Sequence, residues 1–243
     1  VYAHKGSMDF RIKSKGRASH SSLPFLGQNA IKPLLEFIQN INQEYEKIMQ
    51  TVKGESLDFS NMINKLENQL PNHITKEKAQ ELIQGLVMTN SIVQGGTQVN
   101  SVPDFATAEF NVRTIPEYNN NKVKALFNKY VEQANHNGAS LTQELYLDLE
   151  PVVTTGQNRL VELGFDIAKS HFSNERDLII TPTVAVTDAS NLLKGKDENF
   201  PFLMFGPGNG PHQINECVEK ANYLEFVEYY IEFITSYLNE ENE

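Results

Sequence analysis

The segment Ser7-Met-Asp-Phe-Arg-Ile-Lys13 alternates between apolar and polar side chains. Met8, Phe10 and Ile12 fall on one face of an extended chain, and the polar residues between them fall on the other. This two-residue period predicts a strand that buries one face against a core and leaves the other face polar.

The sequence that follows predicts three more strands and two long helices. The strands are expected over residues 86–93, 106–112 and 141–149. One helix is expected after Asn29, which is a plausible cap, and the other over 123–134, before Gly138. With a helical insertion at about 50–84, the order from Ser7 to Leu149 is β-α-β-β-α-β. This is the ferredoxin-like arrangement, a four-stranded antiparallel sheet with two helices on one face.

A different pattern begins after Pro151. We expect a helix over about 158–172, strands over 178–181 and 201–205, and a last amphipathic helix with apolar residues from Leu224 to Leu238. This alternation of helices and strands is typical of the end of a doubly wound α/β domain.

Composition excludes several classes of partner. The 243 residues carry a formal net charge of −10, which argues against nucleic acid because phosphate binding needs a basic surface. No apolar run approaches the roughly 18–20 residues of a membrane span. The single cysteine, Cys217, allows no intrachain disulfide and favours a reducing, cytoplasmic location. The start at Val1-Tyr-Ala, without Met, leads us to expect a cut within a larger protein.

The loop Gly206-Pro-Gly-Asn-Gly-Pro-His212-Gln-Ile-Asn-Glu216 is the best candidate for a site. Glycine and proline fix its backbone, and it presents an imidazole and a carboxylate at close spacing. We interpret His212 as a metal ligand. His20 lies in a loop of small hydroxyl residues, where a binding role and a structural role are about equally favoured. No His-x-x-x-His, His-x-Asp or cysteine pair completes a metal site, which needs about three protein ligands.

Four blocks in order resemble one known family. They are Gly16-Arg-Ala-Ser-His20-Ser-Ser-Leu-Pro24, Gly95-Gly-Thr-Gln-Val-Asn100-Ser-Val-Pro103, Phe110-Asn-Val-Arg113-Thr-Ile-Pro116, and Gly206-Pro-Gly208 with His212. Together they resemble the zinc-dependent aminoacylase and exopeptidase family, which includes succinyl-diaminopimelate desuccinylases, acetylornithine deacetylases and dipeptidases. Within it the chain looks most like a desuccinylase.

The resemblance implies a catalytic domain with two zinc ions (or cobalt) and a ferredoxin-like lid that mediates homodimerisation. Residues 1–6 would then be a remnant of the catalytic domain, 7–150 the lid, and 151–243 the C-terminal part of the catalytic domain. The family's remaining metal ligands and its general base come before the lid and are absent from this sequence.

Roles for individual residues also follow from the resemblance. His212 would bind zinc, and His20 would reach the partner subunit's active site and stabilise the oxyanion. Asn100 and Arg113 would hold carboxylate or amide groups of the substrate, although a cross-strand ion pair with Glu109 or a neighbour is nearly as favoured for Arg113. Gly206 and Gly208 would let the backbone approach the substrate closely. The role of Asp188 stays open, and Glu216 is favoured as a residue behind the ligands or at a helix start.

The expected reaction is hydrolysis of an N-acyl amino acid amide, with N-succinyl-diaminopimelate giving succinate and diaminopimelate, a step of lysine biosynthesis. The chain as given is expected to be an inactive fragment. Two alternatives remain open: an exopeptidase or dipeptidase of the same family, and a non-catalytic dimerisation module.

Overall fold

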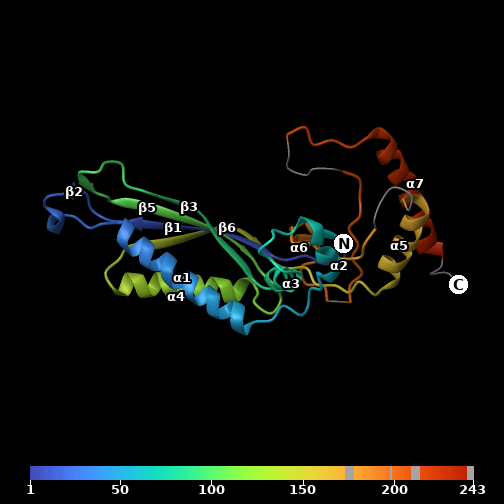
Figure 1. Ribbon diagram of the computed structural model, residues 1–243, viewed down its shortest axis with the longest axis horizontal. Coiled ribbons are helices and arrows are strands. Elements are labelled where there is room, and N and C mark those ends of the chain that lie inside the picture. Colours follow the sequence, from blue (N-terminus) through green and yellow to red (C-terminus); the bar gives the residue numbers. More distant parts are fainter. Residues whose placement is uncertain (173–177, 198, 209–213, 240–243) are drawn as a thin grey trace.

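The computed structural model describes residues 1–172, 178–197, 199–208 and 214–239. The molecule is elongated, with a sheet at one end and the helices α5 (Arg159–Phe172) and α7 (Lys220–Asn239) at the other (Figure 1). The N-terminus lies between these two parts. No helix in the described ranges is long and apolar enough to cross a membrane.

The sheet has the expected ferredoxin-like topology. Its strands are β1 (Ser7–Lys15), β3 (Val87–Gly95), β5 (Phe105–Arg113) and β6 (Leu141–Leu149), in the spatial order β3-β5-β1-β6. All neighbouring pairs are antiparallel. The helices α1 (Ile31–Thr51) and α4 (Asn120–His136) run along the sheet and pack on its apolar face. The prediction of a mixed α/β fold with this sheet is therefore confirmed.

Side-chain caps explain where two of the helices begin. Asn29 Oδ1 accepts hydrogen bonds from Ile31 N at 2.8 Å and Lys32 N at 3.2 Å, at the start of α1. Asn119 Oδ1 accepts one from Lys122 N at 3.2 Å, at the start of α4. Such caps satisfy amide groups that have no partner within the helix.

Short elements complete the described chain. The segment between α1 and β3 contains α2 (Ser60–Leu66), the 3-10 helix η2 (Glu67–Gln69) and α3 (Lys76–Gln84), whose cap is Thr75. A two-residue strand β2 (Ser19–His20) and the 3-10 helix η1 (Pro24–Leu26) follow β1. A matching short strand β4 (Ser101–Val102) precedes β5, and α6 (Ala189–Leu192) lies between α5 and α7.

Four phenylalanine rings form the centre of the core between the sheet and its helices. Phe127 of α4 stacks on Phe10 of β1 with ring centroids 4.2 Å apart. Its edge meets the ring of Phe110 of β5 at 5.3 Å, and Phe37 of α1 lies 6.0 Å away. A second aromatic cluster joins α5 to α7 through Phe172, Phe226 and Tyr229.

The strands expected over 178–181 and 201–205 do not form. Residues 178–182 and 201–205 form neither a helix nor a strand. Their backbone pairing is limited to isolated contacts with the N-terminal segment, such as Thr183 N to Ala3 O at 2.9 Å and Met204 N to Val1 O at 2.8 Å. An extended apolar segment becomes a strand only where a neighbouring segment offers a full hydrogen-bond ladder, and none does so within the described residues.

The aromatic core predicts a large loss of stability on truncation of Phe127. We expect Phe127→Ala to lower the free energy of unfolding by about 3–5 kcal/mol, because it removes buried area and leaves a cavity. Urea unfolding followed by far-ultraviolet circular dichroism measures this. Phe25→Ala is the matched control, since Phe25 is 75% exposed, and it should change stability by less than about 0.5 kcal/mol. Equal effects of the two substitutions would contradict the assigned core.

Candidate functional site

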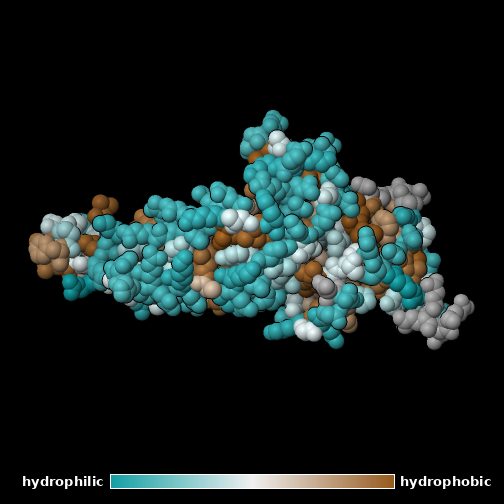
Figure 2. Space-filling model, turned by 90° about the horizontal axis from the view of Figure 1, so that it is seen from below, coloured by the Kyte–Doolittle hydropathy of each residue, from teal (hydrophilic) through white to brown (hydrophobic). Residues whose placement is uncertain are grey.

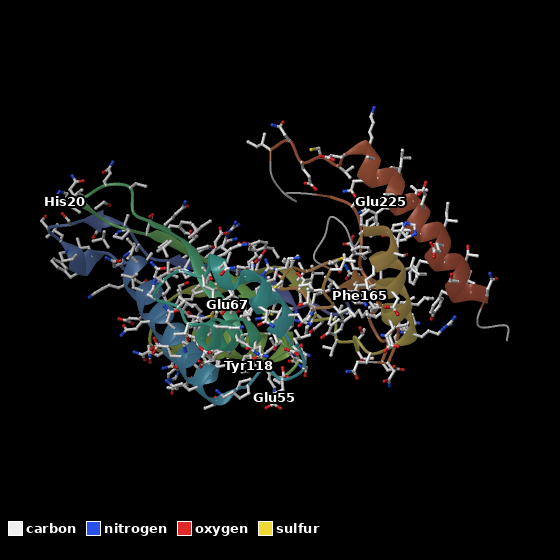
Figure 3. The ribbon with its side chains drawn as sticks, turned by 45° about the vertical axis from the view of Figure 1, so that its right-hand side comes forward. His20, Glu55, Glu67, Tyr118, Phe165 and Glu225 are labelled. Carbon is white, nitrogen blue, oxygen red and sulfur yellow. The ribbon has the colours of Figure 1, made fainter. Side chains whose placement is uncertain are left out.

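His20 and Asn100 lie together at the free end of the sheet, which we call the tip (residues 19–26 and 97–102). The strand β2, which contains His20, pairs with β4, so that His20 lies opposite Ser101. Ser21 N donates a hydrogen bond to Asn100 O at 2.9 Å. In Figure 3 the labelled His20 stands at one end of the molecule, and Phe165 of α5 lies near the other. Two residues assigned to the site from the sequence are thus neighbours at the tip.

The His20 ring is held through one nitrogen. Its Nδ1 lies 2.7 Å from Ser22 Oγ and accepts a hydrogen bond from Ser22 N at 3.2 Å. His20 O also accepts a bond from Leu23 N at 2.9 Å, which closes a turn over residues 20–23. No role for Ser22 was predicted from the sequence. The serines that follow His20 were the one indication, because serine side chains often form hydrogen bonds within a turn.

Apolar side chains surround this histidine. Leu23, Phe25, Leu26 and Val99 are all exposed, with Val99 fully so. Figure 2 shows apolar surface at the corresponding left-hand end of the molecule. An exposed apolar group of this kind is typical of a surface that contacts another molecule.

Arg113 lies at the opposite end of β5, which we call the base of the sheet. Its strand position is opposite Val87 of β3. The alternative for Arg113, an ion pair with Glu109, does not form, because Glu109 Oε1 pairs with Arg11 Nε at 2.9 Å and Glu109 Oε2 accepts from Tyr146. The register explains this, since Arg11 lies directly opposite Glu109. Arg113 Nη1 is instead buried, without a hydrogen-bond partner among the described residues.

A second cation, Lys5, is buried beside Arg113. Lys5 is 0% exposed, and its Nζ donates to Gly85 O at 2.5 Å and lies 5.7 Å from the centre of the Phe59 ring. Burial, and then the nearby Arg113 guanidinium, lower the pKa of Lys5 to about 8. In the described part of the chain no carboxylate forms an ion pair with either cation. Two adjacent cations without an anion fit an anionic ligand such as a carboxylate.

Lys5 was missed at the level of sequence. It stands in the segment His4-Lys5-Gly6, where Gly6 N donates to Thr114 O at 3.0 Å and Thr114 N donates to Gly6 O at 3.2 Å. A side chain added at Gly6 would collide with Thr114 Oγ1 at 2.1 Å, so the glycine permits the close pairing that brings Lys5 next to β5. A lysine flanked by such a glycine was the only signal, and the sequence alone gives no measure of its burial.

The loop after residue 205 is described only in part. Gly206 follows Phe205, whose carbonyl accepts a hydrogen bond from Tyr230 Oη of α7. Gly208 has φ of 137°, a backbone conformation that favours glycine. His212 lies outside the described residues, and Glu216 is exposed. The carbonyl of Asp188 accepts bonds from Asn191 N and Leu192 N at the start of α6.

The described residues do not by themselves form a metal centre. In the ranges 1–172, 178–197, 199–208 and 214–239, no three His, Cys, Asp or Glu side chains lie where they could hold a metal ion together. The predicted ligand His212 is not among those residues. The chemistry that they do offer is an imidazole held by hydrogen bonds at the tip, and a buried lysine beside a half-buried arginine at the base.

The tip and the base are too far apart to act on one small molecule within one chain. β5 has nine residues between them, which at the usual rise correspond to about 27 Å between its ends. Gly206 follows Phe205, whose carbonyl accepts a hydrogen bond from Tyr230 of α7, so this loop is attached to α7 and not to the sheet. His20 and Asn100 therefore share one end of the molecule, and Arg113 and the glycine loop do not.

Comparison with known proteins relates this chain to one protein family. The family model for the M20 peptidase dimerisation domain matches residues 2–139. A probable succinyl-diaminopimelate desuccinylase from Staphylococcus epidermidis is 38% identical over 239 residues, which cover 98% of this chain and 57% of the relative. The chain thus spans a little over half the length of such curated relatives.

Solved structures share the fold. A metallo-carboxypeptidase of the M20 family from Sulfolobus solfataricus aligns with a TM-score of 0.66 at 18% identity, over 96% of this chain and 58% of that chain. The dipeptidase Dug1p from Saccharomyces cerevisiae aligns with a TM-score of 0.64 at 16% identity, over 96% of this chain and 54% of that chain.

The buried Lys5 predicts that stability rises with pH in the alkaline range. The native state releases the Lys5 proton near pH 8, whereas the unfolded chain keeps it to about pH 10.5. Between these values the unfolded state binds more protons, so raising the pH favours the native state. Relative to Lys5→Met, the wild type should gain about 2 kcal/mol between about pH 7.5 and pH 9.5.

Urea unfolding of both proteins at the two pH values measures this gain. Lys53→Met is the matched control, because Lys53 is exposed. It should follow the pH dependence of the wild type. Parallel pH profiles for the wild type and Lys5→Met would contradict a buried ammonium group at this position.

Proposed function

Because the chain belongs to the M20 peptidase family, we propose that it forms part of a metal-dependent amidohydrolase in which two subunits build each active site. The reaction that we propose is hydrolysis of N-succinyl-diaminopimelate to succinate and diaminopimelate. The similarity to the staphylococcal desuccinylase supports this choice of substrate. The pair Lys5 and Arg113 also supports it, because the substrate is rich in carboxylates.

One observation carries the two-subunit arrangement: the separation of His20 and Asn100 at the tip from Arg113 at the base. Within one chain they lie at opposite ends of β5, whose nine residues span about 27 Å at the usual rise. A twofold dimer brings the tip of one subunit to the partner, and by symmetry does so twice. The exposed apolar residues around His20, such as Phe25 and Val99, supply a surface for that contact.

We propose the following division of the chain. Residues 7–150 act as the lid and dimerisation domain, and residues 1–6 and 151–243 belong to the catalytic domain. Backbone contacts support this grouping, since His4 N donates to Val152 O at 2.9 Å and Lys5 N donates to Thr183 O at 3.2 Å. The first residues of the chain thus pair with segments that follow the lid.

Each site residue then has a proposed role. His20 donates a hydrogen bond to the oxyanion that develops at the scissile carbonyl, and Asn100 binds the substrate from the same tip. Arg113, with Lys5 beside it, binds a substrate carboxylate through its forked donors. Gly206 and Gly208 let the backbone approach the substrate.

We further propose that His212 is one ligand of a site for two zinc ions, or cobalt in their place. No three potential ligands lie together among the described residues, and we propose that the remaining ligands and the general base precede the lid in the complete enzyme, as the family resemblance implies. We therefore expect the isolated chain to have no desuccinylase activity. Addition of zinc to the isolated chain, followed by an assay of succinate release, tests this expectation. The lone cysteine is a free, exposed thiol, and we propose a cytoplasmic location.

Complementation between subunits tests the proposed function. In a complete hydrolase that contains these residues, His20→Ala and Arg113→Ala should each be nearly inactive. Mixed dimers of the two variants contain one site with both residues intact. Random exchange makes half of the dimers mixed, so the mixture should recover about one quarter of the wild-type activity. Succinate release after subunit exchange measures it.

A pair of tip variants provides the control. His20→Ala mixed with Asn100→Ala should recover nothing, because every site then receives a damaged tip. Recovery in that control, or full activity of homodimeric His20→Ala, would overturn the two-subunit site. If all variants keep their activity, the chain is instead a dimerisation module without catalytic groups. Parallel assays with dipeptides would identify an exopeptidase.

A further inference from the structure

We propose that Ser22 is a positioning residue that holds His20 in the tautomer with its proton on Nε2 and directs that N–H group out of the tip. This inference rests on the proposed function only for its consequence in catalysis. The geometry itself belongs to the tip of a single chain, where it can be measured without a metal or a partner.

The backbone amide and the hydroxyl of Ser22 together favour one tautomer of His20. An amide N–H can only donate, and Ser22 N donates to His20 Nδ1 at 3.2 Å. Nδ1 therefore accepts this bond, which favours the neutral tautomer with the proton on Nε2. The hydroxyl Oγ of Ser22, 2.7 Å from the same nitrogen, then also acts as a donor. Two donors on one nitrogen disfavour the tautomer with a proton on Nδ1.

The same contacts fix the direction of the ring. Ser22 is itself held in place, because the turn over residues 20–23 is closed by Leu23 N on His20 O at 2.9 Å. The neighbouring Ser21 N donates to Asn100 O, which attaches the turn to the second loop of the tip. Within the described residues Nε2 has no hydrogen-bond partner, and His20 is exposed. The free N–H is therefore available to a group outside the chain.

This tautomer suits the proposed role. An oxyanion is stabilised by a donor that is already in place, and the other tautomer would present a lone pair to it. The contacts with Ser22 disfavour the tautomer that presents a lone pair on Nε2, and they do so already in the single chain, before it meets a partner subunit. A neutral Nε2–H donor also needs no proton from solution.

Nuclear magnetic resonance of the isolated chain tests the tautomer. The chain is labelled with 15N in its histidines, and proton–nitrogen correlations are recorded at about pH 8.5, where imidazoles in water are neutral. The His20 signals are assigned by their loss in His20→Gln. In the wild type we expect one tautomer, with Nε2 protonated and Nδ1 unprotonated. In Ser22→Ala we expect a shift toward a mixture of tautomers.

Two variants complete this experiment. Ser22→Thr keeps a hydroxyl at the same position and should restore the spectrum of the wild type. Ser21→Ala is the matched control and should leave the spectrum unchanged, because its side chain forms no hydrogen bond among the described residues. A protonated Nδ1 in the wild type, or a Ser22→Ala spectrum identical to that of the wild type, overturns the proposal.

A kinetic measurement in the complete hydrolase separates this inference from the proposed function. Ser22→Ala should lower kcat roughly fivefold with little change in KM, the effect expected from one lost hydrogen bond, and Ser22→Thr should recover most of it. If His20→Ala leaves the rate intact, the proposed function fails while the measured tautomer stands. If His20→Ala is inactive but Ser22→Ala retains the full kcat, the positioning role fails alone.

Discussion

The antiparallel pairing of β1 with β5 is the constraint on which the rest of the structure depends. It runs without interruption from the pair Met8 and Val112 to the pair Lys15 and Phe105. One face of this ladder provides the rings of Phe10 and Phe110 to the core, and the other face holds the ion pair between Arg11 and Glu109. Because the two strands are paired along their whole length, the residues at the tip are held at a fixed distance from those at the base.

The two ends differ in their electrostatic character. The base holds the buried Lys5 near the half-buried Arg113, where a reduced dielectric makes their repulsion costly and an incoming anion correspondingly favourable. The tip holds a solvent-exposed imidazole among apolar side chains, where no charge is needed for the hydrogen bond that it can donate. The two cations at the base thus lower the stability of the folded chain, whereas the exposed imidazole at the tip lowers it little.

The sequence predicted the features that depend on local periodicity. The alternation of apolar residues in β1 and their helical spacing in α1 predicted the sheet and the helices that pack on it. Asn29 and Thr75 were recognisable as helix caps. The prediction from sequence failed where contacts between distant segments determine the structure. The segment 201–205 has the apolar pattern of a strand, but no neighbouring strand pairs with it among the described residues. The same limit affected the site. His20 and Asn100 could be named from their motifs, but the pairing of Glu109 with Arg11 depends on the register between two strands 98 residues apart.

The span of the sheet also has a consequence for how this fold can change. In the proposed two-subunit site, adding two residues to each strand would keep every side chain on its own face and would leave the core intact. It would nevertheless move the tip by about 7 Å, more than a hydrogen bond can bridge. Strand length would then act as a molecular ruler, and selection on activity would hold it constant at positions where neither packing nor any catalytic group requires it.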